Sequence, residues 1–178
     1  DQGSKYEGAV ISFASGVSDD GEGDTHEYSW DFGDGETSSQ QNPDHIYKDN
    51  GIYKVCATVL DDDAGEDTSC DSLVILNVIP ELDANIPTNG YEGSNTIFQT
   101  NVIDPGESDT HSYIWDFGDG NTSNEQNPEH NYIDDGTYTV CVEVADDDGD
   151  TDKTCSFIII LNENPVIEAL NTQDGTEG

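Results

Sequence analysis

The sequence has almost no positive charge. Its 178 residues include four lysines and no arginine against 40 acidic residues, so the formal net charge is −36. Nucleic acids are bound through phosphates that need cationic partners, so this composition excludes a nucleic-acid partner. An anionic membrane surface would repel the chain for the same reason. Because self-repulsion of this size opposes a compact state, we expect bound divalent cations or a saline habitat to offset it.

Long hydrophobic runs and methionine are also missing. The longest apolar run, Phe157–Leu161, has five residues, whereas a membrane-spanning helix needs about 20, so we expect no membrane insertion in this segment. The chain starts at Asp1 without methionine, and we expect it to be a processed or excised piece. Apolar residues make up only 32 % of the chain, but they are patterned, which argues against disorder.

An internal repeat organises the chain. Equivalent residues recur at a constant offset of 85, as in Trp30 and Trp115 or Gly51 and Gly136. The final Glu177-Gly178 continues the series that begins with Glu7-Gly8 and Glu92-Gly93. The repeat predicts one domain over residues 1–79, a second over residues 80–164, and the start of a third repeat over residues 165–178. We interpret the chain as a segment of a longer tandem array.

Within each copy the apolar residues alternate with polar ones, as in half-buried strands. Tyr53, Val55, Ala57 and Val59 share one parity, and Tyr138, Val140, Val142 and Val144 repeat it. Glycine, asparagine and aspartate interrupt these runs every 8–12 residues or so, as in an antiparallel sandwich. The sequence therefore predicts an all-β fold of two tandem Ig-like, seven-stranded β-sandwiches.

Three motifs carry a family resemblance. Each copy contains Tyr-x-Trp-Asp-Phe-Gly-Asp-Gly, then Asn-Pro-x-His-x-Tyr, then Gly-x-Tyr-x-Val. This combination resembles the polycystic-kidney-disease (PKD) domain over nearly the whole of both copies. The resemblance implies β-sandwiches on extracellular proteins, commonly in tandem and non-catalytic.

The acidic WDFGDG motif itself is interpreted as scaffold. Trp30 and Phe32 share one strand parity, so we expect Trp30, and likewise Trp115, to anchor the core. Gly33 and Gly35 supply backbone freedom for a turn, and Asp31 is expected to accept local backbone hydrogen bonds. A kinase function is excluded because no glycine-rich loop or catalytic HRD segment accompanies the motif.

Four cysteines form one pair per copy, each pair 14 residues apart. Both midpoints fall in an acidic turn between two strands, so a hairpin there places the cysteines opposite one another and facing outward. We predict the disulfides Cys56–Cys70 and Cys141–Cys155, which indicate an oxidising, extracellular compartment. Zinc binding and free thiols are the alternatives, although no CxxC spacing supports zinc.

Two loops in each copy are crowded with oxygen ligands. They are residues 18–26 and 60–67 in the first copy, and residues 103–111 and 145–152 in the second. Dense like charge is costly without a cation, and Ca²⁺ accepts six to eight hard oxygens in flexible geometry. His26 and His111 adjoin these acids and are expected to hydrogen-bond them. The alternative is that these acids are solvated turn residues.

Ig-like topology places both loops at one end of a sandwich, beside the linker from the preceding copy. We expect a calcium site there, similar in logic to the joints of cadherin repeats. Its predicted ligands are Glu7, Asp49, Asn77, Asp104, Asp109, Asp146 and Asp148. At the equivalent end of the first copy, a second and less complete site is predicted from Asp19, Asp24, Asp61 and Asp63.

These features predict a non-catalytic extracellular repeat, namely a calcium-stiffened spacer, stalk or fibre segment of a larger surface or secreted protein. Its expected partners are neighbouring repeats, with self-association into a fibre and a glycan or protein ligand as further possibilities. The alternative is an accessory substrate- or glycan-binding module of a secreted hydrolase. Asn121-Thr122-Ser123 is a candidate glycosylation site at Asn121.

Overall fold

A computed structural model describes residues 5–18 and 25–164 of the chain. These residues form an all-β fold, as the alternating pattern predicted, and none of the described elements is a helix. Accordingly, the described part of the chain offers no helical segment of sufficient length and hydrophobicity to cross a bilayer. The predicted third repeat, residues 165–178, lies outside the described residues.

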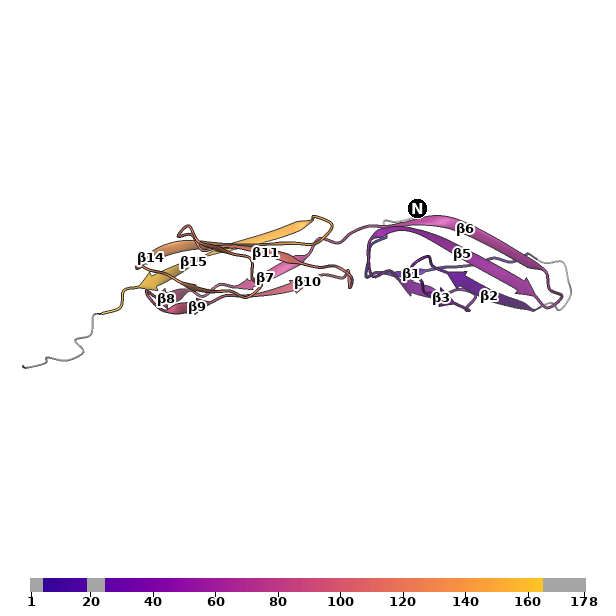
Figure 1. Ribbon diagram of the computed structural model, residues 1–178. Helices are drawn as coiled ribbons and strands as arrows, with labels where there is room; N and C mark the ends of the chain where they lie inside the picture. The colour runs from indigo at the N-terminus through magenta and orange to yellow at the C-terminus, as the bar shows by residue number, and fades with distance from the viewer. Residues whose placement is uncertain (1–4, 19–24, 165–178) are drawn as a thin grey trace, which may run out of the picture. The chain divides into compact units, whose positions relative to one another are not determined.

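The first copy is a sandwich of two sheets (Figure 1). A four-stranded sheet has the order β3-β2-β5-β6, and β1 pairs with β4 in the second sheet. The strands are β1 (Val10–Ser12), β2 (His26–Asp31), β3 (Thr37–Ser38), β4 (Asp44–Ile46), β5 (Gly51–Asp61) and β6 (Glu66–Ile75).

The second copy contains a five-stranded sheet of order β12-β11-β14-β15-β8, with the pairs β13-β9 and β10-β7. Its strands are β7 (Glu81–Asn85), β8 (Asn89–Tyr91), β9 (Asn95–Ile97), β10 (Gln99–Ile103), β11 (Ser112–Asp116), β12 (Thr122–Ser123), β13 (Glu129–Asn131), β14 (Gly136–Ala145) and β15 (Thr151–Leu161).

Two parallel contacts depart from the antiparallel pattern that the sequence predicted. Strand β8 runs parallel to β15, with Leu161 opposite Tyr91, and the first copy has a parallel bridge between Tyr6 and Leu76. A parallel pair needs a long connection rather than a hairpin. Between β8 and β15 this connection contains the strands β9 to β14. The alternation of residues within a single strand cannot reveal such a long-range pairing.

The core of each copy is a row of aromatic rings that repeats almost unchanged. In the first copy Phe32 stacks on His45 at 4.0 Å, and in the second Phe117 stacks on His130 at 4.1 Å. Trp30 and Trp115 are buried at equivalent positions, which confirms their predicted role as core anchors. The two copies therefore pack their cores with the same aromatic residues at equivalent positions.

The WDFGDG motif is scaffold, as predicted, because its acids bind the local backbone and a core histidine. Asp31 Oδ1 accepts a hydrogen bond from the Gly33 amide at 2.9 Å. Asp34 accepts one from the Glu36 amide, and its other oxygen lies 2.6 Å from His45 Nε2. Gly33 has φ +84°, and a Cβ there would lie 2.7 Å from the Lys54 carbonyl oxygen. The motif therefore ties its own turn to the Asn-Pro-x-His-x-Tyr segment.

Both predicted disulfides are confirmed. Cys56 pairs with Cys70 and Cys141 with Cys155, each across 14 residues. In the first copy the cysteines stand directly opposite one another in the β5–β6 ladder. The described residues contain no free cysteine.

We expect intact-mass analysis to detect these bonds directly. Treatment of the denatured, unreduced chain with an alkylating reagent should add no mass, because all four sulfurs are bonded. Alkylation after reduction should modify four cysteines. Four modified cysteines without prior reduction would contradict both disulfides.

Candidate metal centre

The candidate centre lies within one compact unit, which comprises residues 1–81, 102–112 and 144–152. Both sequence copies therefore contribute residues to this unit. The loop that follows β10 is folded back on itself by Asp104, whose Oδ1 accepts a hydrogen bond from the Gly106 amide at 3.1 Å. Its Oδ2 lies 2.9 Å from His111 Nε2, as expected from the sequence for that histidine. These two contacts fix the Asp104 side chain within its own loop.

Two glycines allow the close approaches in this unit. A Cβ at Gly106 would overlap the Asp109 carboxylate, and one at Gly8 would overlap Pro105. Gly8 also has φ +69°, which disfavours any other residue. The hairpin turn after β14 joins the same unit, because the Thr110 amide donates to Asp147 Oδ1 at 3.1 Å. The two acidic loops of the second copy are therefore neighbours, as the topology predicted.

Glu7 is the most unusual residue of the unit, because it is an acid with 1 % of its surface exposed. Its Oε1 accepts a hydrogen bond from the Val78 amide at 2.6 Å. Its Oε2 is buried and receives no hydrogen bond from any described residue. Burying a carboxylate oxygen without a partner is expensive, so a positive charge placed beside this oxygen would be stabilising.

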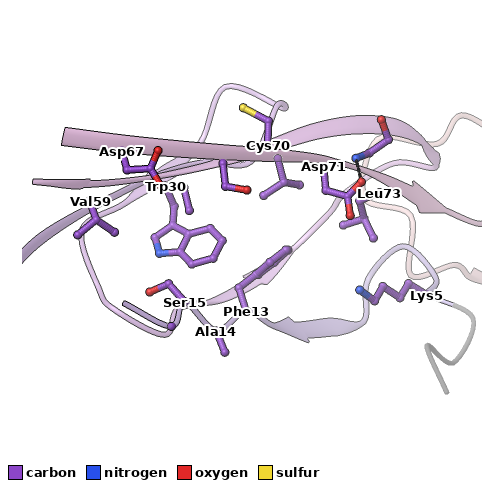
Figure 2. Close-up of a pocket in the computed structure, with 15 residues that line it drawn as sticks. Lys5, Phe13, Ala14, Ser15, Trp30, Val59, Asp67, Cys70, Asp71 and Leu73 are labelled. Carbon is purple, nitrogen blue, oxygen red and sulfur yellow. Dashed lines mark hydrogen bonds between the residues drawn. The ribbon is translucent and has the colours of Figure 1, made fainter. Parts of the chain in front are cut away.

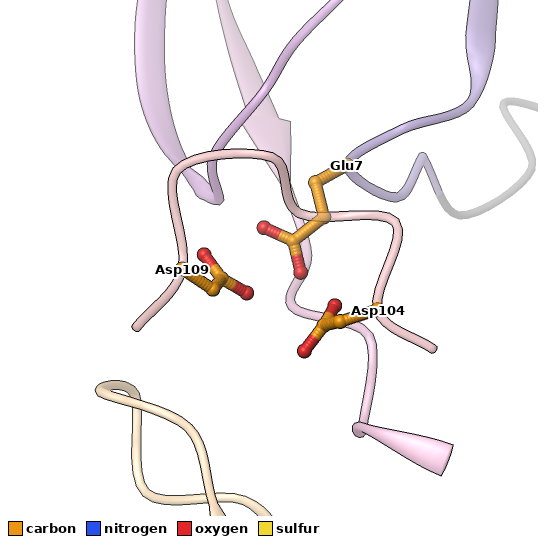
Figure 3. Close-up of side chains that lie close together, drawn as sticks. All are labelled: Glu7, Asp104 and Asp109. Atoms are coloured by element: carbon orange, nitrogen blue, oxygen red, sulfur yellow. The ribbon is translucent and has the colours of Figure 1, made fainter. Parts of the chain in front are cut away.

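Three carboxylates converge around Glu7. Glu7, Asp104 and Asp109 each offer an oxygen within 4.8 Å of the others, and Figure 3 shows their carboxylates turned toward one another. Asp49, Asp109 and Asp148 form a second such group, so Asp109 belongs to both. A second oxygen without a partner, Asp109 Oδ2, is buried here.

Asn77 joins the unit through the hairpin turn. Its Nδ2 donates to Asp146 Oδ2 at 2.9 Å and to Asp150 Oδ2 at 3.0 Å. Its Oδ1 is buried and has no hydrogen-bond partner among the described residues. Asp146 is thus fixed by the Asn77 amide rather than turned toward the carboxylate groups above.

The electrostatics of the cluster follow from burial and like charge. Desolvation, followed by repulsion from Glu7, Asp104, Asp147 and Asp49, raises the pKa of Asp109 to about 7. Desolvation also raises the pKa of Glu7, although the Val78 hydrogen bond opposes the rise. Lys48, one of the four lysines, pairs with Glu107 at 3.5 Å. A divalent cation at the cluster would relieve this repulsion.

We expect the unfolding free energy of the calcium-free protein to fall as pH rises from about 4 to 7. The pKa of Asp109 is raised from 3.8 to about 7 on folding, so the folded state holds this proton more tightly than the unfolded state. That contribution is complete below pH 3.8 and is lost as pH rises through 7. Thermal midpoints measured across this range test the expectation, with Asp109→Asn as the control that reduces the slope. Equal slopes in both proteins would contradict it.

The chemistry of the cluster matches a hard cation. Its candidate ligands are carboxylate oxygens without thiolates, and the nearby His111 nitrogen is engaged by Asp104. Such oxygen sets suit Ca²⁺, whereas zinc prefers cysteine sulfur and histidine nitrogen. Glu7, Asp49, Asp104, Asp109 and Asp148 are the residues that fit such an ion.

The predicted outer site of the first copy is only partly described. Asp19 and Asp24 lie outside the described residues. Asp61 Oδ1 accepts a hydrogen bond from the Gly65 amide at 2.6 Å, and Asp63 is exposed in the same turn. Among the described residues, neither acid belongs to a group of three potential ligands.

Two features escaped the sequence interpretation. Asp150, which accepts a hydrogen bond from Asn77, lies within the acidic hairpin turn but was not among the predicted ligands. A further group, Glu92, Asp134 and Asp135, brings three acids together, and Glu92 Oε1 accepts the Glu163 amide at 3.0 Å. The offset of 85 residues relates Glu92 to Glu7 and Asp134 to Asp49, so the repeat itself was the available signal.

The fold and its disulfides define a tandem repeat of Ig-like β-sandwich domains. The chain belongs to the PKD domain family, whose model matches residues 3–75 and again residues 77–159. The family resemblance noted in the sequence is thus confirmed for both copies.

Among curated relatives, the chain is 34 % identical over 116 residues to collagenase ColQ1 of Bacillus cereus (strain Q1), covering 61 % of this chain and 12 % of that protein. It is 40 % identical over 88 residues to the microbial collagenase of Vibrio alginolyticus, covering 49 % and 11 % respectively. Among solved structures, the PKD1 domain of Vibrio anguillarum Epp matches with 30 % identity and a TM-score of 0.43, covering 49 % of this chain and all of that one. The chain thus spans only about a tenth of the length of these curated relatives.

Proposed function

We propose that this chain is a non-catalytic, calcium-binding tandem module that serves outside the cell as a spacer, stalk or fibre segment of a larger surface or secreted protein. The observation that carries the proposal is the Glu7 carboxylate, which is 1 % exposed and has one oxygen without a hydrogen-bond partner among the described residues. The Glu7 carboxylate faces those of Asp104 and Asp109, which carry charge of the same sign.

Calcium suits both the ligands and the setting. The disulfides favour an oxidising, extracellular compartment, where calcium modules typically have dissociation constants of about 10⁻⁴–10⁻³ M. If the free calcium concentration exceeds the dissociation constant ten- to hundredfold, and if calcium binds only the folded state, binding adds roughly 1.4–2.7 kcal/mol of stability. That is a substantial share of the roughly 5–15 kcal/mol that keeps a domain folded.

The proposed mechanical role follows from where the ligands lie in the sequence. Glu7 and Asp49 belong to the first copy, Asn77 follows it, and Asp104 and Asp109 belong to the second copy. A cation that binds acids of both copies restricts the chain between them. Without the cation, repulsion among the same acids favours conformations in which these acids lie farther apart. Calcium would therefore set the stiffness of the array.

Calorimetry and small-angle X-ray scattering of the intact chain, with and without calcium, test this proposal. We expect calcium to raise the thermal midpoint and to narrow the distribution of interatomic distances. Sodium chloride at matched ionic strength separates specific binding from screening, because screening alone acts equally with either salt. Curves that coincide with calcium and with the matched sodium salt would reject calcium stiffening.

A second candidate is an accessory module of a secreted hydrolase. Its support is that the matched relatives are named collagenases and a pre-pro-metalloprotease, of which the matched segment is a small part. The second copy also exposes the aromatic residues Phe157 and Tyr91, with Tyr91 opposite Leu161. Exposed aromatic groups of this kind contact flat substrates such as sugar rings.

Co-sedimentation with chitin, cellulose and collagen distinguishes this candidate from a plain spacer. An accessory module should sediment with one of these polymers, and Phe157→Ala should weaken that binding without changing the thermal midpoint. Ile133→Ala, which alters another highly exposed apolar residue, is the matched control. If none of the three polymers retains the chain, the spacer role stands alone.

A further inference from the structure

The acids of the candidate metal centre form two groups rather than one. Glu7, Asp104 and Asp109 each bring an oxygen to within 4.8 Å of the others, and Asp49, Asp109 and Asp148 do the same. The ligand oxygens of one calcium ion lie about 2.3–2.6 Å from it, so no two of them are more than about 5 Å apart. Among the described residues these acids do not join into a single group. One ion in this arrangement therefore binds one group and leaves two acids of the other.

Asp109 is the member that both groups share. Its backbone amide donates to the Gly106 carbonyl at 3.2 Å, and a Cβ at Gly106 would overlap its carboxylate. The carboxylate is thus packed directly against the Gly106 backbone. Its Oδ2 is buried and has no hydrogen-bond partner among the described residues. Because a carboxylate has two oxygens, it can bind one cation through each oxygen and so bridge a pair of ions.

Two hydrogen bonds hold the second group beside the first. The Ser108 amide donates to the Lys48 carbonyl at 3.1 Å, which fixes the segment before Asp49 against the loop that follows β10. The Thr110 amide donates to Asp147 Oδ1 at 3.1 Å, which fixes the hairpin turn after β14 against the same loop. The acids of the second group therefore come from three segments that these contacts hold together.

Burial and charge both favour more than one cation. Glu7 is 1 % exposed, and its Oε2 has no hydrogen-bond partner among the described residues. Figure 3 shows the Glu7 carboxylate turned toward those of Asp104 and Asp109. When ionised, the acids of the two groups carry five negative charges, of which one Ca²⁺ leaves three and two Ca²⁺ leave one. Like charges that are partly removed from water are costly unless cations neutralise them.

We propose that the centre holds two calcium ions, which the Asp109 carboxylate bridges. The inner ion binds Glu7, Asp104 and Asp109. The outer ion binds Asp49, Asp109 and Asp148, of which Asp148 is exposed to solvent. Water and backbone carbonyl oxygens complete both coordination shells. The pair rests on the calcium-binding function proposed above and deepens it, because each ion joins an acid of the first copy to acids of the second.

Equilibrium dialysis of the intact chain against radioactive calcium counts the bound ions. Glu7→Gln should bind one ion fewer than the unaltered chain, Asp148→Asn should also bind one fewer, and the double variant two fewer. Asp109→Asn should bind two fewer, because it removes the shared charge. If Glu7→Gln does not fold, Asp104→Asn takes its place, since an asparagine oxygen can still accept the loop amide. Asp67→Asn is the control, because Asp67 is exposed and belongs to neither group.

Manganese provides a second readout, because Mn²⁺ also prefers carboxylate and carbonyl oxygens. Two-metal sites place their ions about 3.5–4 Å apart, so the electron paramagnetic resonance spectrum of the manganese-loaded chain should show magnetic coupling between neighbouring ions. Glu7→Gln and Asp148→Asn should each abolish this coupling while one ion stays bound. Ions scattered over the acidic surface would show no such coupling.

The outcomes separate the ion pair from calcium binding itself. A double variant that loses only one ion, together with a manganese spectrum without coupling, would overturn the pair and leave a centre with a single calcium ion. If none of the variants binds fewer ions than Asp67→Asn, then calcium binding at this centre fails as well, and with it the proposed function.

Discussion

Replacing Glu7 with glutamine is expected to weaken calcium binding at least about tenfold and to raise the stability of the calcium-free protein. The amide oxygen can still accept the Val78 hydrogen bond that Glu7 Oε1 accepts at 2.6 Å, so the local fold should persist. The new NH₂ group takes the place of the oxygen without a partner and can donate to Asp104 or Asp109. The substitution therefore removes one negatively charged candidate ligand. It also places the positive end of the amide dipole where the cation would lie.

Isothermal titration with calcium and thermal melts with and without the ion measure both effects. Glu125→Gln is the control, because Glu125 is an exposed glutamate that belongs to no group of three acids among the described residues. We expect this variant to retain the calcium response. Equal losses in the two variants would instead indicate diffuse binding to acidic surface, which contradicts a defined centre at Glu7.

Replacing Trp115 with alanine is expected to destabilise the second copy by about 3–5 kcal/mol, which can consume most of the stability of a small domain. Trp115 is fully buried and packs against Phe98 and Phe117, with ring centres 5.4 and 6.3 Å away. The close-packed rings cannot collapse fully into the space of an indole. Calorimetry should show the transition of the second copy shifted to lower temperature.

Two controls define this effect. Ile114→Ala alters a neighbouring residue of β11 that is more than half exposed, so its cost should stay below about 1 kcal/mol. Trp30→Ala should cost less than Trp115→Ala, because Trp30 is 6 % exposed and borders a pocket of about 480 Å³, shown in Figure 2, whereas Trp115 is fully buried. An equal or larger loss for Trp30→Ala would show that the pocket beside Trp30 does not make this side chain easier to replace.

The disulfides and the motif roles could be predicted because they depend on local spacing. A hairpin centred midway between Cys56 and Cys70 places them opposite one another whatever the rest of the fold does, and the observed register agrees. The turn at Gly33 and the backbone hydrogen bond to Asp31 likewise involve residues two apart. Such features need only strand parity and turn chemistry.

The acidic cluster was predicted by topology rather than by spacing. Asp104 and Asp148 are 44 residues apart in the sequence, yet both belong to loops at one end of an Ig-like sandwich. Their gathering with Glu7 and Asp49 into groups within 4.8 Å agrees with that expectation. The sequence did not distinguish Asp146, which Asn77 holds, from the acids that face one another. That choice depends on side-chain orientation across long sequence separations.

The sequence alone determined the repeat, the β-sandwich class, the cysteine pairs and the acidic loops, because periodicity and fixed spacing are properties of a linear chain. Only the tertiary structure decided that Glu7 is buried with an oxygen that has no partner among the described residues, that β8 runs parallel to β15, and that Trp30 borders a pocket. Burial and desolvation depend on which segments cover a side chain. Those segments come from distant parts of the sequence, so no local pattern records them.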